Sequence, residues 1–168
     1  ADSIETAECW QIAIECCTGP SVVVLSRQGL ATVRTDHTDE NLSAKGAYLL
    51  ANSDGERKVT ILATGSEVEI AMEARAILQS DGVPTAVVSM PSWNIFEQQD
   101  QAYRNFVLGS GVRVAVEAAV GMGWDKYIGP EGVFIGMSSF GASAPASDLY
   151  KHFDITAEAI IKVVKDRL

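Results

Sequence analysis

Residues Val59–Met90, VTILATGSEVEIAMEARAILQSDGVPTAVVSM, have the pattern of one strand–helix–strand unit. Val59–Ala63 is a short apolar and β-branched run, which is typical of a strand buried on both faces. Ser66 and Glu69 have the spacing of a capping box, which predicts the start of a helix. Thr85–Met90 is then the next strand. Such a unit implies a parallel crossover with a crevice at the carboxyl end of the first strand, the usual ligand site of open α/β sheets.

Outside this unit, the sequence from residue 44 onward predicts a further succession of strands and helices. The predicted strands are residues 46–51, 59–63, 85–90, 112–117 and 133–137. Besides the helix after Ser66, helices are predicted at 93–107, 147–152 and 156–168, with a helical turn at 124–128. The polar turn Asn52–Glu56 favours an antiparallel hairpin between the first two strands. The order is that of an α/β domain with a largely parallel sheet.

The first 43 residues differ in character from the rest of the chain. Residues 3–17 have the period of an amphipathic helix, and Ser21–Ser26 is an apolar run that predicts a buried strand. The apolar stripe expected for the helix consists of Ala7, Trp10, Ile14 and Cys17. Gly29–Ser43 is polar, lacks a clear period and is about 15 residues long, near the limit for a structureless loop in a compact domain. We therefore expect it to be an interdomain linker.

Length and charge restrict the classes of partner. The chain has 168 residues, enough for one domain or for one domain with a piece of another. Its net charge is −9, with 13 basic side chains scattered among 22 acidic ones. Binding to phosphate backbones depends on clustered Lys and Arg, so neither nucleic acid nor an anionic membrane is an expected partner. No apolar run approaches the ~18 residues of a membrane span and no signal peptide opens the chain, which favours a cytoplasmic protein.

The three cysteines, Cys9, Cys16 and Cys17, lie in or next to the first predicted helix. Cys9 and Cys16 are separated by about 10 Å along such a helix at 1.5 Å per residue. That separation exceeds the ~7 Å between Cα atoms that a disulfide bridges. We expect reduced thiols, in agreement with a cytosolic setting.

Several segments resemble catalytic or binding motifs, but each lacks a defining residue. The turn Thr64–Ser66 and the segment Gly121–Gly123 could each cradle an anion, yet neither completes a P-loop or a dinucleotide fingerprint. Both are interpreted as plain turns. Ser143 is not expected to be a nucleophile, because a proline occupies the second glycine position of the nucleophile elbow. The two histidines have no cysteine nearby, so a zinc site is not expected.

Arg27 is a stronger candidate for a functional residue. It follows the predicted strand Ser21–Ser26 at its carboxyl end, where active-site groups of α/β sheets collect. Its planar cation is suited to a pair of phosphate oxygens. A structural salt bridge to the acid-rich linker is an equally good interpretation of its position. The residues alone leave both interpretations open.

Eight motifs carry a resemblance to a known family. They are Ile4–Trp10, Leu25–Gln28, Gly46–Tyr48, Ala63–Val68, Val87–Trp93, Gln99–Arg104, Arg113–Ala118 and Phe140–Pro145. Together they resemble the C-terminal quarter of a transketolase. The resemblance implies that residues 1–43 are the tail of the pyrimidine-binding domain with the interdomain linker, and that residues 44–168 are the C-terminal α/β domain. That domain is expected to have three layers and a mixed five-stranded sheet, mostly parallel with one antiparallel strand.

The resemblance also implies a reaction. Transketolases transfer a two-carbon ketol unit between sugar phosphates in the pentose phosphate pathway, with thiamine diphosphate and a divalent cation (Mg or Ca), as dimers. Arg27 matches the arginine that binds the substrate phosphate, although Gly29 stands where the family usually has Asn. The chain contains neither the Gly-Asp-Gly…Asn-Asn motif for metal and diphosphate nor the catalytic histidines. We therefore expect no catalytic, cofactor-binding or metal-binding residue here, and no activity from this segment without the rest of a transketolase chain.

The sequence is also compatible with three alternatives. The chain resembles, more weakly, the corresponding domain of other thiamine enzymes, namely the β subunit of 2-oxo acid dehydrogenases and deoxyxylulose phosphate synthase. Leu25–Gln28 and Gly141–Pro145 favour transketolase over these. Residues 44–168 are alternatively a dimerisation module. The crevice after Ala63 is alternatively a regulatory small-molecule site, by analogy of fold.

Overall fold

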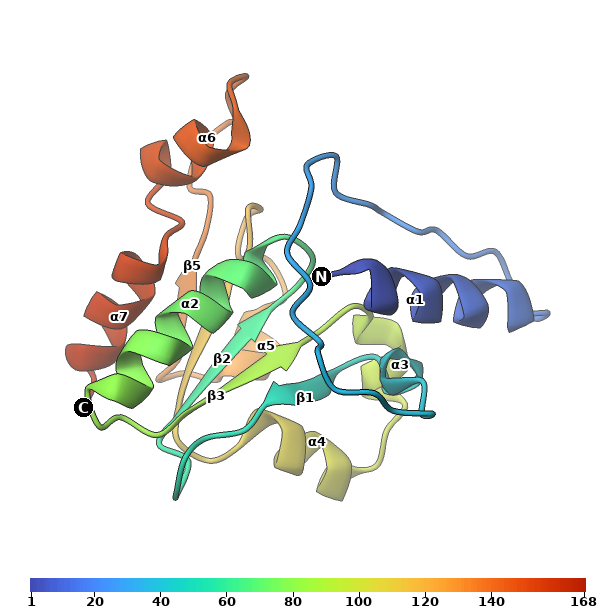
Figure 1. Cartoon of the computed structure of the whole chain (residues 1–168), viewed down its shortest axis with the longest axis horizontal. Coiled ribbons are helices and arrows are strands. Elements are labelled where there is room, and N and C mark those ends of the chain that lie inside the picture. Colours follow the sequence, from blue (N-terminus) through green and yellow to red (C-terminus); the bar gives the residue numbers. More distant parts are fainter.

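Strands β2 (Val59–Ala63) and β3 (Thr85–Ser89), joined by helix α2 (Glu67–Ser80), form the strand–helix–strand unit that the sequence predicts. In the computed structural model, which describes residues 1–168, these strands pair in parallel. The other strands are β1 (Tyr48–Ala51), β4 (Val112–Val116) and β5 (Val133–Ile135). The helices before and after α2 are α1 (Ser3–Glu15), the 3₁₀ helix η1 (Leu42–Lys45), α3 (Trp93–Glu97), α4 (Gln101–Leu108), α5 (Asp125–Ile128), α6 (Ala146–His152) and α7 (Ala157–Lys165). The strands form one mixed sheet in the order β1-β3-β2-β4-β5 (Figure 1).

The antiparallel strand is β1, but the predicted hairpin with β2 is wrong. β1 pairs antiparallel with β3, where Tyr48 lies opposite Ser89. Both edges of β2 are already occupied, because β3 and β4 pair with it in parallel. Every residue of β2 is buried, which fits the central place of this strand in the sheet. The polar turn Asn52–Glu56 therefore predicted where the chain turns, but it did not predict which strands pair with each other.

Helices cover both faces of the sheet and make the three-layer arrangement that was expected. Successive side chains of a strand point to opposite faces. Ile61 accordingly joins the cluster that α2 and α7 complete, whereas Leu62 joins a second cluster with residues of α3, α4 and α5. α2 and α7 lie side by side on their face of the sheet (Figure 1). None of the helices is long and apolar enough to cross a membrane.

The helix caps agree with the sequence in part. Thr156 caps α7, accepting a hydrogen bond from the amide of Ala159 at 3.2 Å. The capping box predicted at Ser66 is not formed, since Ser66 has a helical backbone and its hydroxyl donates to Glu67 instead. The single helix predicted over 93–107 is divided into α3 and α4. Asp100 starts the second helix by accepting the amide of Tyr103 at 2.7 Å.

The part before residue 44 differs most from the sequence expectation. α1 forms, but its expected apolar stripe faces outward, with Trp10 and Ile14 exposed. Ser21–Ser26 is not a strand, and Val22 and Val24 are 87% and 89% exposed. A strand needs the hydrogen-bonding edge of a neighbour, and this segment has none in the chain.

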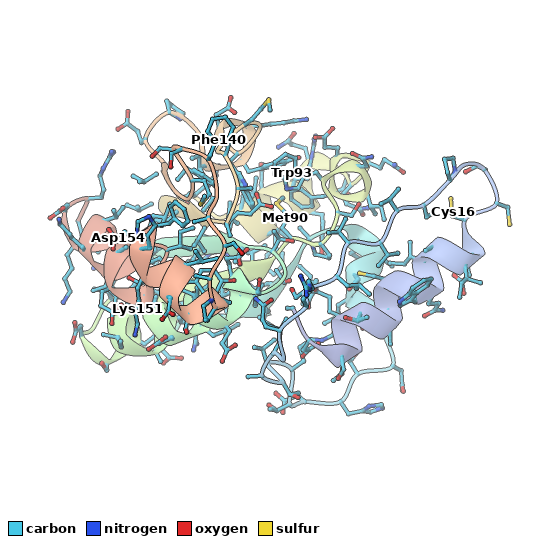
Figure 2. All side chains as sticks on the ribbon, turned by 90° about the horizontal axis from the view of Figure 1, so that it is seen from above. Cys16, Met90, Trp93, Phe140, Lys151 and Asp154 are labelled. Carbon is cyan, nitrogen blue, oxygen red and sulfur yellow. The ribbon has the colours of Figure 1, made fainter.

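The three cysteines are unpaired thiols. Cys9 is half-buried, and Cys16 and Cys17 are exposed at the end of α1. Figure 2 shows Cys16 at the tip of the α1 arm, well away from Met90 and Trp93 in the body of the domain.

Candidate functional site

Arg27 lies in the irregular segment between α1 and η1. Its neighbour Ser26 lies near the turn after β2, and its neighbour Gln28 contacts α6. Gly65, in the turn after β2, has φ +55°, and a Cβ placed on it would lie 3.9 Å from the hydroxyl of Ser26. On the other side, the side-chain amide of Gln28 donates to the hydroxyl of Tyr150 in α6 at 3.4 Å. Arg27 itself is exposed. None of the chain's salt bridges involves it, so the structural ion pair considered as an alternative is not formed.

A short series of hydrogen bonds between side chains supports this segment. The hydroxyl of Tyr150 donates to Oε1 of Glu67 at 2.5 Å, and the hydroxyl of Ser66 donates to the same oxygen at 2.8 Å. Glu67 opens α2 and is only 5% exposed. Burial, together with the hydrogen bond to Glu67, raises the pKa of Tyr150 to about 12. Tyr150 is therefore a neutral hydrogen-bond donor at physiological pH.

The crevice expected after Ala63 is present as a cavity of about 700 Å³. One side is formed by α1 and another by the irregular segment that carries Arg27. Its floor contains Thr64 and Gly65 after β2, and Pro91 and Ser92 after β3. Arg27 does not line it, whereas its neighbours do. The segment before the linker thus borders the crevice that the strand–helix–strand unit leaves open.

A second group of polar side chains attaches α1 and the linker to the sheet. Glu8 and Arg34 form an ion pair of 2.9 Å between Oε1 and Nη2. Glu8 also accepts the amide and hydroxyl of Ser43, at 3.0 and 2.8 Å. Burial tends to raise the pKa of Glu8, but the hydrogen bonds from Arg34 and Ser43 outweigh it, and the pKa lies below its usual value. The guanidinium of Arg34 lies over the ring of Tyr48, 5.4 Å from its centre.

The first turns of α1 supply the other acids of this group. Asp2 accepts the backbone amide of Arg34 at 3.0 Å and caps α1 through the amide of Glu5 at 2.9 Å. The carboxylate of Glu5 is buried, accepts the hydroxyl of Tyr48 at 2.9 Å and also contacts the hydroxyl of Ser89. Burial and the Glu5 carboxylate both raise the pKa of Tyr48. The sequence reasoning missed this group, although acids three residues apart on one helix face were its visible signal.

The remaining motif residues stay apart from Arg27. Gly121 and Gly123 are required by packing, since a Cβ would come within 2.8 Å of the Phe134 ring and 2.7 Å of the Trp93 ring. Ser143 is exposed in its loop, and His37 contacts only Asp39. No group of three or more His, Cys, Asp or Glu side chains is placed to hold a metal ion. The residues of this chain therefore do not fit the divalent cation that the resemblance implies for the intact enzyme.

Comparison with known proteins agrees with this architecture. The family model described as the transketolase-like C-terminal domain matches residues 46–156. Transketolase of Cereibacter sphaeroides is 54% identical over 168 residues, which are the whole of this chain and 25% of the relative. Transketolase of Sinorhizobium medicae is 57% identical over 162 residues, covering 96% of this chain and 23% of the relative.

Solved structures give the same result. Transketolase of Pichia stipitis in complex with sedoheptulose 7-phosphate is 32% identical, with a TM-score of 0.88 over 99% of this chain and 24% of that chain. The chain therefore spans about a quarter of the length of the relatives that it matches. The family model covers most of the chain, and transketolases more than 50% identical to it align with nearly its whole length; the chain therefore belongs to the transketolase family.

Proposed function

We propose that this chain acts as the C-terminal portion of a transketolase, an enzyme that transfers a two-carbon ketol unit between sugar phosphates. The match of the whole chain to transketolases is the observation that carries the proposal. The position of Arg27 supports it, because Arg27 is exposed and its neighbours Ser26 and Gln28 line the crevice after β2, where substrates of α/β enzymes bind. These matches do not favour the other thiamine enzymes considered above.

The proposal divides the chain into two parts. Residues 1–43 are the tail of the pyrimidine-binding domain and the interdomain linker, and residues 44–168 are the C-terminal domain. The outward apolar residues of α1 and the unpaired Ser21–Ser26 segment support the first assignment, since both need a partner that the chain does not contain. All five strands and both apolar clusters lie within the second part.

In this function Arg27 binds the phosphate group of the sugar substrate. A guanidinium can donate two parallel hydrogen bonds to phosphate oxygens, which makes the contact both strong and directional. Because Arg27 has no salt bridge within the chain, its donors are free for a ligand. Thiamine diphosphate and a divalent cation would supply the carbon–carbon chemistry in the intact enzyme, and we assign them no residue of this chain.

The proposed partners are the rest of the transketolase chain and a second copy of the enzyme, as a cytoplasmic homodimer without nucleic acid or membrane. Unpaired thiols fit a reducing compartment. Val120, Met122 and Phe140 are exposed in the loops after β4 and β5, and such apolar side chains suit a subunit contact. Figure 2 shows Phe140 in the loop that leaves the body of the domain.

The test is Arg27→Ala in the intact transketolase that carries this segment. Loss of a charge-assisted contact should raise KM for a phosphorylated ketose by roughly 10- to 100-fold. KM for an unphosphorylated ketose should change far less, because that donor lacks the group that Arg27 binds. Arg167→Ala is the matched control, since Arg167 is an exposed arginine at the other end of the chain. Equal effects on both donors would remove the assigned role.

A further inference from the structure

We propose that Tyr150 is a positioning residue, which holds the Arg27 segment against the carboxyl end of β2 through Gln28 and Glu67 and thereby sets the affinity for the substrate phosphate. This inference rests on the proposed function. Tyr150 belongs to α6, more than 120 positions along the chain from Gln28, so only the tertiary structure brings the two together.

The chemistry of the three groups makes the hydroxyl indispensable. The amide nitrogen of Gln28 only donates hydrogen bonds, and the carboxylate of Glu67 only accepts them. The hydroxyl of Tyr150 does both, since it accepts from Gln28 at 3.4 Å and donates to Glu67 at 2.5 Å. A phenylalanine of the same shape would leave Gln28 without its acceptor.

Glu67 is the fixed end of the series of hydrogen bonds Gln28–Tyr150–Glu67. Its carboxylate is nearly inaccessible and receives a second hydrogen bond, from Ser66 at 2.8 Å. Glu67 lies in the first turn of α2, where a negative charge interacts favourably with the helix dipole. The anchor is therefore a regular element of the domain, whereas Gln28 lies in a segment with no regular structure of its own.

The hydrogen bond from Gln28 to Tyr150, at 3.4 Å, ties the residue after Arg27 to α6. On the other side of Arg27, the hydroxyl of Ser26 lies near the turn after β2, 3.9 Å from the position that a Cβ on Gly65 would take. Gly65 has no side chain, so the contact that tethers the segment is the one made by Gln28. A backbone tethered next to Arg27 restricts where the guanidinium can reach, so less conformational entropy is lost when it binds a phosphate.

The kinetic test compares Tyr150→Phe with Tyr127→Phe in the intact holoenzyme. Tyr127 donates a similar hydrogen bond, to Glu97 at 2.8 Å, but its ring belongs to the cluster on the opposite face of the sheet. Loss of the Tyr150 hydroxyl should lower kcat/KM for a phosphorylated ketose, relative to an unphosphorylated one, by roughly two- to tenfold, mainly through KM. Tyr127→Phe should leave this ratio within experimental error.

Two further measurements distinguish positioning from general support of the fold. Gln28→Ala should reproduce the effect of Tyr150→Phe, and the double variant should be no worse than the more affected single variant, because both break one chain of contacts. Amide hydrogen exchange at residues 27–29 in the substrate-free enzyme should be faster in Tyr150→Phe and unchanged in Tyr127→Phe.

The outcomes separate this inference from the function on which it rests. If Arg27→Ala affects phosphorylated ketoses selectively while Tyr150→Phe alters neither the ratio nor the exchange rate, the positioning role is wrong and the proposed function stands. If Tyr150→Phe and Gln28→Ala are additive, they do not act through one contact and the positioning role is again wrong. If Arg27→Ala has no selective effect, the phosphate site is wrong and the inference falls with it.

Discussion

Replacement of Arg34 by Leu should weaken the attachment of α1 and the linker to the sheet by about 3 kcal/mol. The side chains of Arg34 and Glu8 are 6% and 12% exposed, so the ion pair between them is largely buried. Removing one partner of a buried pair costs roughly 3–5 kcal/mol, because the other charge is left without compensation. Glu8 would keep its two hydrogen bonds from Ser43, which places the expected loss at the lower end of that range.

Amide hydrogen exchange of α1 measures this loss directly, since the opening free energy of the helix is read from its slowest amides. Arg167→Leu is the matched control. Its pair with Glu131 is 3.8 Å long, and the two side chains are 44% and 95% exposed. A surface pair of this kind contributes about 0–1 kcal/mol. The control should therefore have little effect on any helix.

The double variant Glu8→Gln/Arg34→Leu provides the decisive comparison. Neutralising Glu8 removes the uncompensated charge, so the double variant should lose less than the sum of the two single losses. A loss below about 1 kcal/mol for Arg34→Leu would refute the reasoning, because it would fall within the range of a surface pair. Additive losses would refute it as well, since they would show that the two side chains do not stabilise each other.

Three further predictions concern the pH dependence of stability, two glycine substitutions and the activity of the isolated chain. Burial tends to raise the pKa values of Asp2 and Glu8, but their hydrogen bonds and the charge of Arg34 outweigh it. In the folded chain both pKa values therefore lie below their ordinary values of 3.8 and 4.5. In acid the unfolded chain thus binds more protons than the folded chain. The two carboxylates contribute fully to the free energy of unfolding when the pH is above their ordinary pKa values, and this contribution is lost as the pH falls through the lower pKa values of the folded chain. The urea concentration at the unfolding midpoint should therefore fall over this pH range, and it should fall less in Glu8→Gln. Gly46→Ala should cost more than about 2 kcal/mol, because its Cβ would lie 2.2 Å from the Phe96 amide nitrogen at φ +79°. Gly55→Ala, with φ +94° and open space, should cost only the backbone strain of about 1–2 kcal/mol. Finally, the purified 168-residue chain should transfer no ketol units, and measurable turnover would contradict the assignment of the catalytic residues to the rest of the enzyme.

Much of the fold could be predicted because its signals are local. The strand–helix–strand unit at Val59–Met90 has the periods of its elements, and Thr156 lies where a cap is required. The division of the 93–107 helix was missed although Asp100 was a visible cap, because its apolar period continued across the break. The capping box at Ser66 had the correct spacing, but the hydroxyl found a better acceptor in Glu67.

The candidate site could be predicted only as a single residue. Arg27 was identified from its place after an apolar run and from the family motif. Its support by Tyr150 and Glu67 could not be inferred, since the two contacts join segments that are far apart in the chain. The buried face of α1 was predicted wrongly for a similar reason. Hydrophobicity alone predicts that Trp10 and Ile14 face the core, but the surface offered to α1 within this chain carries Arg34, Tyr48 and Ser89.

Most elements of residues 44–168, their mainly parallel sheet and the membership in the transketolase family could be predicted from the sequence. These depend on side-chain period, turn residues and motifs within short windows of the chain. The tertiary structure alone decided that β1 pairs with β3, because that choice depends on which sheet edge the other strands leave free. It also decided which face of α1 is buried and which side chains hold the Arg27 segment. Both outcomes depend on contacts between distant residues, whose free energy no local pattern encodes.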